Sequence, residues 1–162
     1  MLERRSVRKY TSKPISEADR DDIVNAGLHA PSSKNVQAWH FTVVENPDTI
    51  AEIGKQVQAA ILRAGVGGDD DEQGGVFEVH GVVGAFGEAF VFGDAGKTSC
   101  PAEDCAVALE NMFLAAYSLG LGSCWINQLG CVSDEPGFRS FLDGLGVPAG
   151  NTIYGSACFG HP

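Results

Sequence analysis

The amino-acid sequence predicts a single domain in which helices and strands interleave, an α/β or α+β layout. Two observations carry this prediction. Segments with apolar residues at three- and four-residue steps, typical of amphipathic helices, stand between short apolar segments typical of strands. The 162 residues suit one domain of ordinary size, and no internal repeat or linker divides them, so we expect one domain over 1–162.

The first part of the chain contains two predicted helices around a predicted strand. Ser16 stands three residues before Asp19 and just ahead of an apolar pattern, a variant of the capping box, so a helix should begin there and end near Gly27. Alternating and then continuous apolar residues over 38–44 predict a strand. An Asn-Pro pair then supplies the cap and the first-turn proline of a helix over 46–64.

An irregular stretch separates these elements from the rest of the chain. It covers residues 65–87, where glycines flank four consecutive acidic residues, and consecutive carboxylates lack the alternating spacing of a calcium loop, so we expect a solvated loop. Beyond it, Pro101 opens the strongest predicted helix, which Gly120 ends. The other predicted elements are strands over 89–93, 122–126 and 152–159 and a short helix over 136–145.

Charge and composition exclude several classes of partner. The formal net charge of −10 argues against nucleic acid and anionic membranes, because both are bound through basic residues. No apolar run approaches the ~20 residues that span a bilayer, and no signal-peptide core follows Met1, so we expect a cytoplasmic protein.

The cysteines and histidines lack the spacing of a metal site. The four histidines are scattered at 29, 40, 80 and 161, and five cysteines form an odd set without a Cys-x-x-Cys pair. We therefore expect no metal, and reduced thiols rather than a disulfide framework.

Three polar clusters are candidates for binding chemistry. The first, Arg4-Arg5-Ser6-Val7-Arg8-Lys9, gathers cations in an otherwise acidic chain, and guanidinium groups with a hydroxyl suit a phosphate; a solvated basic turn is the alternative. The second covers 30–40, where the amides of Asn35 and Gln37 suit the edge of a heterocycle, although Ser and Asn also serve caps and turns. The third, 120–128, ends a strand in polar amides beside Trp125, which is either a cover for an aromatic ligand or a core residue.

Together and in this order, the clusters resemble the motifs of the nitroreductase superfamily. The resemblance is carried by Arg4–Arg8, Pro31–Trp39 and Gly120–Asn127, and it covers most of the chain, fading from about Gly65 to Phe90. It implies an α+β fold with three α/β/α layers, in which helices flank a mostly antiparallel central sheet. It also implies a homodimer that holds FMN at its interface.

The resemblance further implies which residues bind the cofactor. Arg4 and Ser6 would meet the phosphate, and Arg8 the polar edge of the ring. The loop over 31–37 would come from the other protomer, and backbone amides after the third motif would approach flavin N5. The full implied set is Arg4, Arg5, Ser6, Arg8, Pro31, Ser32, Ser33, Asn35, Gln37, Trp125, Ile126, Asn127 and Gln128.

The implied activity is transfer of hydride from NAD(P)H to an electron-poor acceptor, such as a nitroaromatic or a quinone, by a ping-pong mechanism. No side chain is expected to act as acid or base, since the chemistry takes place at flavin N5. Two alternatives stay open: a flavin-binding module that stores FMN without turnover, and a cofactor-free dimeric interaction domain. Relatives usually continue past Gly160-His161-Pro162 into a basic tail; either this sequence is a piece of a longer chain, or weaker phosphate binding is expected.

Overall fold

The computed structural model describes residues 2–65, 87–94 and 96–162. The irregular stretch predicted over 65–87 lies almost entirely outside these residues. The helices are α1 (Glu17–Leu28), η1, a 3-10 turn (Ser33–Asn35), α2 (Pro47–Ala64), α3 (Pro101–Ser118), α4 (Gln128–Val132) and α5 (Pro136–Gly144). The strands are β1 (Trp39–Val44), β2 (Gly87–Gly93), β3 (Gly122–Ile126) and β4 (Thr152–Gly160).

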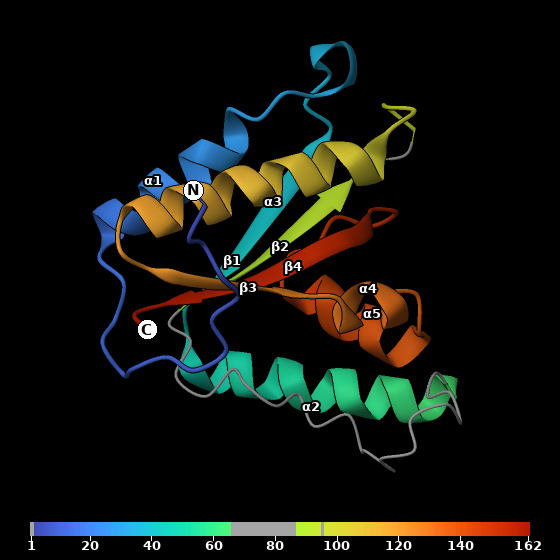
Figure 1. Cartoon of the computed structure of the whole chain (residues 1–162). Helices are drawn as coiled ribbons and strands as arrows, with labels where there is room; N and C mark the ends of the chain where they lie inside the picture. Colours follow the sequence, from blue (N-terminus) through green and yellow to red (C-terminus); the bar gives the residue numbers. More distant parts are fainter. Residues whose placement is uncertain (1, 66–86, 95) are drawn as a thin grey trace.

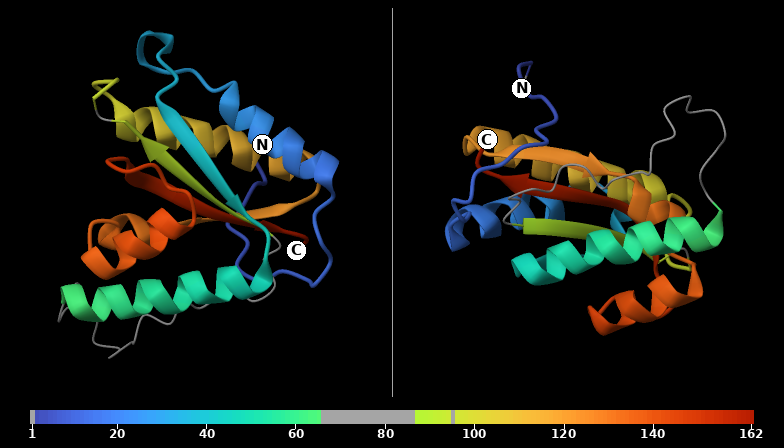
Figure 2. Two further views of the ribbon diagram at one scale, coloured as in Figure 1. Left: turned by 180° about the vertical axis from the view of Figure 1, so that it is seen from behind. Right: turned by 90° about the horizontal axis from the view of Figure 1, so that it is seen from below.

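The four strands form one sheet in the order β1-β2-β4-β3, and every neighbouring pair is antiparallel. Helices α1 and α3 cover one face of this sheet, and α2, α4 and α5 cover the other, as Figure 1 and the turned views of Figure 2 show. The antiparallel pairing decides between the α/β and the α+β layout, both of which the sequence allowed. The fold is α+β with three layers, as the resemblance implied.

A separate hydrophobic core fills each side of the sheet. On the side of α1 and α3, Leu109 and Met112 are almost fully buried with Ala157 of β4. On the other side, the cluster joins α2, α4 and α5 and includes Phe138 and Leu142, each fully buried. Apolar residues at helical steps on α2 and α3 therefore face the sheet from opposite sides.

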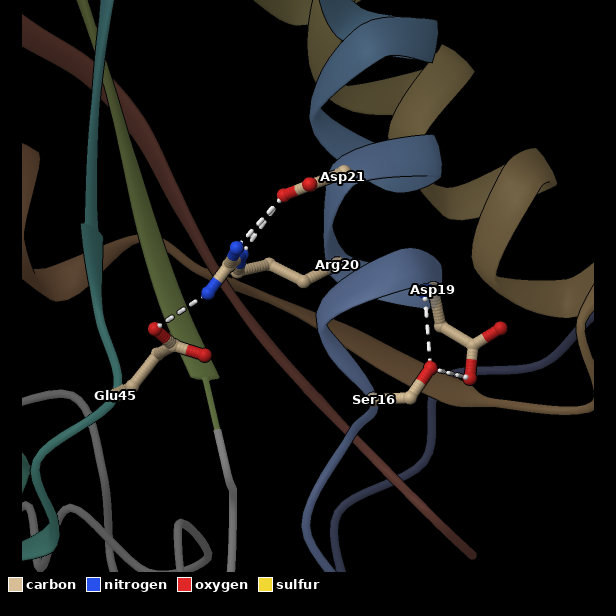
Figure 3. A network of polar contacts seen from close by, with 5 residues as sticks. All are labelled: Ser16, Asp19, Arg20, Asp21 and Glu45. Atoms are coloured by element: carbon tan, nitrogen blue, oxygen red, sulfur yellow. Dashed lines mark hydrogen bonds and ion pairs between the residues drawn. The ribbon is translucent and has the colours of Figure 1, made fainter.

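Local capping explains where the first two long helices begin. The Ser16 hydroxyl oxygen accepts the backbone N–H of Asp19 at 3.1 Å and donates to the Asp19 carboxylate at 2.7 Å. Arg20, one residue further on, bridges Asp21 and Glu45 and thereby joins α1 to the end of β1 (Figure 3). The Asn46 side chain caps α2 as predicted.

Two short elements differ from the sequence-based expectation. Helix α4 spans Gln128–Val132, where the sequence indicated only polar amides at the end of a strand, and η1 lies within the predicted loop. Both are shorter than two turns, too short for a repeating apolar pattern. Among the described helices, none is both long and apolar enough to cross a membrane.

Candidate functional site

The basic N-terminal segment runs along the outer edge of β3. Ser6 forms a parallel bridge with Ser123, and the backbone N–H of Val7 donates to the Ser123 carbonyl at 2.9 Å. The contact requires a glycine at position 122, since a Cβ there would lie 2.7 Å from the side chain of Val7. Residues about 117 positions apart are thus brought together, and the first cluster lies beside the third.

Tyr10 anchors the end of this segment. Its hydroxyl donates to the backbone carbonyl of Val7 at 2.5 Å, and a weaker contact of 3.4 Å reaches the carbonyl of Cys158. Burial, with smaller contributions from Cys158 and Cys124, raises the pKa of Tyr10 well above its ordinary value, although Arg8 opposes the rise. Tyr10 therefore stays a neutral hydrogen-bond donor at physiological pH.

Arg4 lies against the second half of α3. Its guanidinium carbon is 6.0 Å from the centre of the Phe113 ring, within the range of a cation–π contact, and its Nε is 3.9 Å from the Glu110 carboxylate. Tyr117, one turn further along α3, donates to Glu3 at 3.4 Å. Arg4 is therefore placed over an aromatic ring and is still partly exposed.

The other polar members of the first cluster face solvent. Ser6 and Arg8 are exposed, and the exposed Arg5 donates to the backbone carbonyls of Leu2 and Arg4. Exposed guanidinium groups on a segment that is itself fastened to the sheet suit the capture of an anion.

The second cluster is a loop with an unusual backbone. Lys34, Asn35 and Gln37 have φ angles of 52°, 56° and 53°, in the left-handed region that residues with a Cβ rarely adopt. Asn tolerates this region best, whereas Lys and Gln do so poorly. Such backbone persists only where surrounding contacts hold it, and it is concentrated at functional sites.

Hydrogen bonds inside and outside the loop hold this conformation. The Ser32 hydroxyl accepts the backbone N–H of Gln37 at 3.0 Å and so closes the loop on itself. The backbone N–H of Ser33 donates to the Asp104 carboxylate of α3 at 2.8 Å. Of the predicted residues here, Pro31, Asn35 and Gln37 are exposed and the two serines are partly buried.

The third cluster divides between the two faces of the sheet. The Trp125 ring packs edge-on against Phe113 at 6.3 Å between centres, on the side of α3. The side chain of Ile126 packs into the opposite core with α2, α4 and α5. Asn127, which is exposed, and Gln128 then begin α4, where the first backbone N–H groups of a helix lack intrahelical acceptors.

Within one chain, two groups of the predicted residues are attached at different places along α3. Arg4 and Trp125 meet at Phe113, whereas the loop over 31–37 is attached at Asp104. These attachment points are nine positions apart on the helix, or about 13 Å along the axis at 1.5 Å per residue.

Sequence reasoning did not single out Asp104 or Phe113 as residues of the site. Asp104 precedes Ala108 and Met112 at four-residue steps, so this acidic residue lies on the apolar face of the helix. Such a pattern indicates a buried carboxylate that accepts hydrogen bonds. Phe113 was indistinguishable from other core positions of the same helix.

The cysteines are free thiols, as expected. Cys131 is exposed, whereas Cys105, a residue of α3, is buried in the core on the α1 and α3 side of the sheet. Burial, with a contribution from the charge of Asp104, raises the pKa of Cys105 to about 12, so this thiol does not ionise at neutral pH. In the described part of the chain, no group of three His, Cys, Asp or Glu residues could hold a metal ion.

Comparison with solved structures finds nitroreductases with a similar fold. A nitroreductase with bound FMN from Bacteroides fragilis has a TM-score of 0.84 and 38% identity, over 98% of this chain and 83% of that one. An FMN-dependent nitroreductase from Clostridium difficile has a TM-score of 0.76 and 27% identity, over 98% and 83%.

Curated proteins agree with the structural neighbours. A protein of Archaeoglobus fulgidus, provisionally named an NADH dehydrogenase/NAD(P)H nitroreductase, is 28% identical over 163 residues, or 98% of this chain and 81% of that protein. The NADPH-flavin oxidoreductase of Vibrio harveyi is 28% identical over 166 residues, but the chain spans only 64% of its length. The model of the nitroreductase family matches residues 1–161. With this match over nearly every residue and the fold of its solved members, the chain belongs to the nitroreductase family.

Proposed function

We propose that the chain is an FMN-dependent oxidoreductase that uses NAD(P)H to reduce an electron-poor acceptor such as a nitroaromatic or a quinone. The main observation behind the proposal is the attachment of the basic segment to β3, which brings Arg4 to the same aromatic ring, Phe113, that Trp125 contacts. FMN in the solved neighbours and NADPH in the name of the Vibrio harveyi relative support the choice of cofactors.

The chemistry of the donors fits FMN. Its phosphate needs cations and a hydroxyl, which Arg4, Arg5 and Ser6 supply on one exposed segment. The ring edge needs planar donors and acceptors, which Arg8, Asn35 and Gln37 supply. Ser32, Ser33 and Pro31 shape the loop, and the backbone N–H groups of Asn127 and Gln128 add donors at the end of β3.

The site is completed by two copies of the chain. Within one copy the loop and the basic segment are attached to α3 about 13 Å apart along its axis. The family resemblance implies that loop 31–37 of a partner closes the site. We therefore infer a homodimer with two equivalent FMN sites, a symmetric arrangement in which each copy supplies both halves.

When bound by these residues, FMN would supply the redox chemistry, namely acceptance of hydride from the nicotinamide and, separately, transfer of electrons to the acceptor. The chain binds and orients the ring and leaves a face of it accessible to both substrates in turn. No side chain needs to transfer a proton in this scheme. The domain over 1–162 and a cytoplasmic location remain predictions.

The experiment is a visible absorption spectrum of the purified protein, reconstituted with FMN, before and after anaerobic NADH or NADPH. We expect flavin bands that bleach with a nicotinamide and return when a quinone or a nitroaromatic is added. Light scattering on the same sample should give the mass of two chains. A protein that binds FMN without bleaching would favour the storage module, and one that binds none would favour the interaction domain.

A further inference from the structure

Asp104 is a buried carboxylate in the first turn of α3, with 6% of its surface exposed. Both of its oxygens accept hydrogen bonds, Oδ1 from the backbone N–H of Ser33 at 2.8 Å and Oδ2 from the hydroxyl of Thr98 at 3.0 Å. Thr98 Oγ1 itself accepts the backbone N–H of Cys100 at 3.2 Å, which directs the hydroxyl proton toward the carboxylate. Asp104 and its donors thus form one satisfied, buried unit.

The loop needs an anchor of this kind. Three of its residues lie in the left-handed region, and the bond from Gln37 to the Ser32 hydroxyl closes the loop without attaching it to the domain. The bond from Ser33 to Asp104 makes that attachment, across 71 positions of sequence. At the end of the loop, the Ala38 carbonyl accepts the backbone N–H of Asp94 at 3.2 Å, so Asp94, just after β2, and Asp104, in the first turn of α3, support the loop at two places.

We propose that Asp104 is a positioning residue for the cofactor: its carboxylate holds loop 31–37, through the Ser33 N–H, in the conformation that meets FMN. Asp104 itself is not expected to touch FMN, because only 6% of its surface is exposed and both of its oxygens already accept hydrogen bonds from Ser33 and Thr98. This inference rests on the proposed function for its ligand. Its structural half, the anchoring of the loop, can be measured without any ligand.

The substitutions Asp104→Ala and Asp104→Asn should differ in their effect on the loop and on FMN affinity. Asp104→Ala leaves the Ser33 N–H and the Thr98 hydroxyl without their acceptor, so the loop should leave its strained conformation. If the binding conformation falls to about one tenth of the population, the apparent Kd for FMN rises about tenfold. Asp104→Asn keeps an oxygen for Ser33 and places an N–H₂ group where it can donate to Thr98 Oγ1. We expect it to restore most of the affinity.

A matched control stands one residue away. Glu103 belongs to the same first turn of α3 and carries the same charge, but it is exposed. Glu103→Ala therefore removes a carboxylate near the helix N-terminus without removing the loop anchor. It should leave both loop exchange and FMN affinity unchanged.

The first measurement is hydrogen exchange by mass spectrometry on the full chain without FMN. We expect Asp104→Ala to speed exchange in the peptide that covers 31–37 while the peptides of α2 keep their wild-type rates, and Asp104→Asn to return the loop toward wild type. Equal acceleration in the loop and in α2 would mean a general loss of stability and would overturn the proposal. So would unchanged exchange in the loop.

The second measurement is titration of the same proteins with FMN, followed by quenching of flavin fluorescence. The expected order of affinity is wild type and Glu103→Ala first, Asp104→Asn next and Asp104→Ala last. Equal affinities for Asp104→Ala and wild type would contradict the positioning role. A wild-type protein that binds no FMN would instead reject the proposed function, while loop exchange would still decide whether Asp104 anchors the loop.

A further variant covers the case in which Asp104→Ala does not fold. Thr98→Val removes the hydroxyl that orients Oδ2 but keeps the size of the side chain and the Ser33 contact. We expect faster exchange confined to 31–37, smaller than in Asp104→Ala. Exchange in the loop at the wild-type rate would count against an anchor held by this unit.

Discussion

Arg63 near the end of α2 and Glu135 at the start of α5 form a two-pronged ion pair. Nε of Arg63 is 3.0 Å from Oε1 of Glu135, and Nη2 is 2.7 Å from Oε2. The same carboxylate accepts the backbone N–H of Phe138 at 2.8 Å and thereby caps α5. One side chain thus joins two helices of the layer that lies opposite α3.

This pair predicts a dependence of stability on pH. Arg63, followed by the backbone N–H of Phe138, lowers the pKa of Glu135 from 4.5 to about 2. A carboxyl whose pKa is lowered by folding stabilises the fold above its unfolded pKa, and this contribution is lost as the pH falls from about 4.5 to about 2.

The measurement is thermal unfolding of wild type and Glu135→Gln between pH 7 and pH 2. We expect the variant to melt lower at pH 7 and the difference to shrink through this window. Glu17→Gln, in the exposed first turn of α1, is the control. A difference that stays constant down to pH 2 would show that the charge of Glu135 is not what joins the helices.

Arg4 should discriminate between phosphorylated and unphosphorylated flavin. A charge-assisted hydrogen bond contributes about 1.5–3 kcal/mol, so Arg4→Ala should weaken FMN binding by roughly 10- to 100-fold. Riboflavin lacks the phosphate, and its affinity should change much less. Fluorescence titration with both ligands tests this, with Lys13→Ala as the control for net charge. Equal losses for FMN and riboflavin would place Arg4 away from the phosphate.

Gly155 should not tolerate a side chain. A Cβ on Gly155 would lie 2.5 Å from Leu109 Cδ1 and 2.8 Å from Trp125 Cζ2, so Gly155→Ala crowds the contact between β4 and α3. Overpacking of this kind costs about 1–3 kcal/mol in the free energy of unfolding. Urea unfolding measures it.

The matched control for this substitution is Gly144→Ala. Gly144 ends α5 with open space around its Cβ position, and alanine is the better helix former by up to about 1 kcal/mol. We expect this variant to be as stable as wild type or slightly more so. If Gly155→Ala behaved in the same way, the close packing of Trp125 over β4 would be refuted.

The thiols should react with iodoacetamide at different rates, and the exposed Cys131 should react before the buried Cys105. Cys131 is exposed, whereas Cys105 is 1% exposed and its pKa is raised to about 12. The thiolate is the reactive form, so iodoacetamide at pH 8 should label Cys131 within minutes and leave Cys105 unlabelled until the protein unfolds. Peptide mapping after timed quenching gives both rates. Comparable labelling of Cys105 in the native protein would contradict its burial.

Much of the fold was predictable because its determinants are local. The cap at Ser16, the Asn46-Pro47 pair and the apolar spacing after Pro101 each act within a few residues, and the structure has helices at all three places. The strand over 122–126 was predicted with its observed bounds. Helix α4 was missed, since five residues cannot display a helical period.

The family resemblance was confirmed, and it supplied what local patterns left open. Alternating helices and strands were compatible with either a parallel or an antiparallel sheet. The three motifs pointed to the antiparallel, three-layer arrangement that the order β1-β2-β4-β3 then showed. The expected cofactor agrees with the FMN bound in solved neighbours, whereas the roles of individual residues remain predictions.

The sequence alone determined the longer helices and the strands, the acidic charge and the three polar clusters, because helix and strand periods and capping are properties of neighbouring residues. Only the tertiary structure decided how the clusters are attached. The bridge from Ser6 to Ser123, the bond from Ser33 to Asp104 and the ring contact of Phe113 with Trp125 join residues that are distant in the chain. Such pairings depend on how both cores pack against one sheet, and no local pattern encodes that.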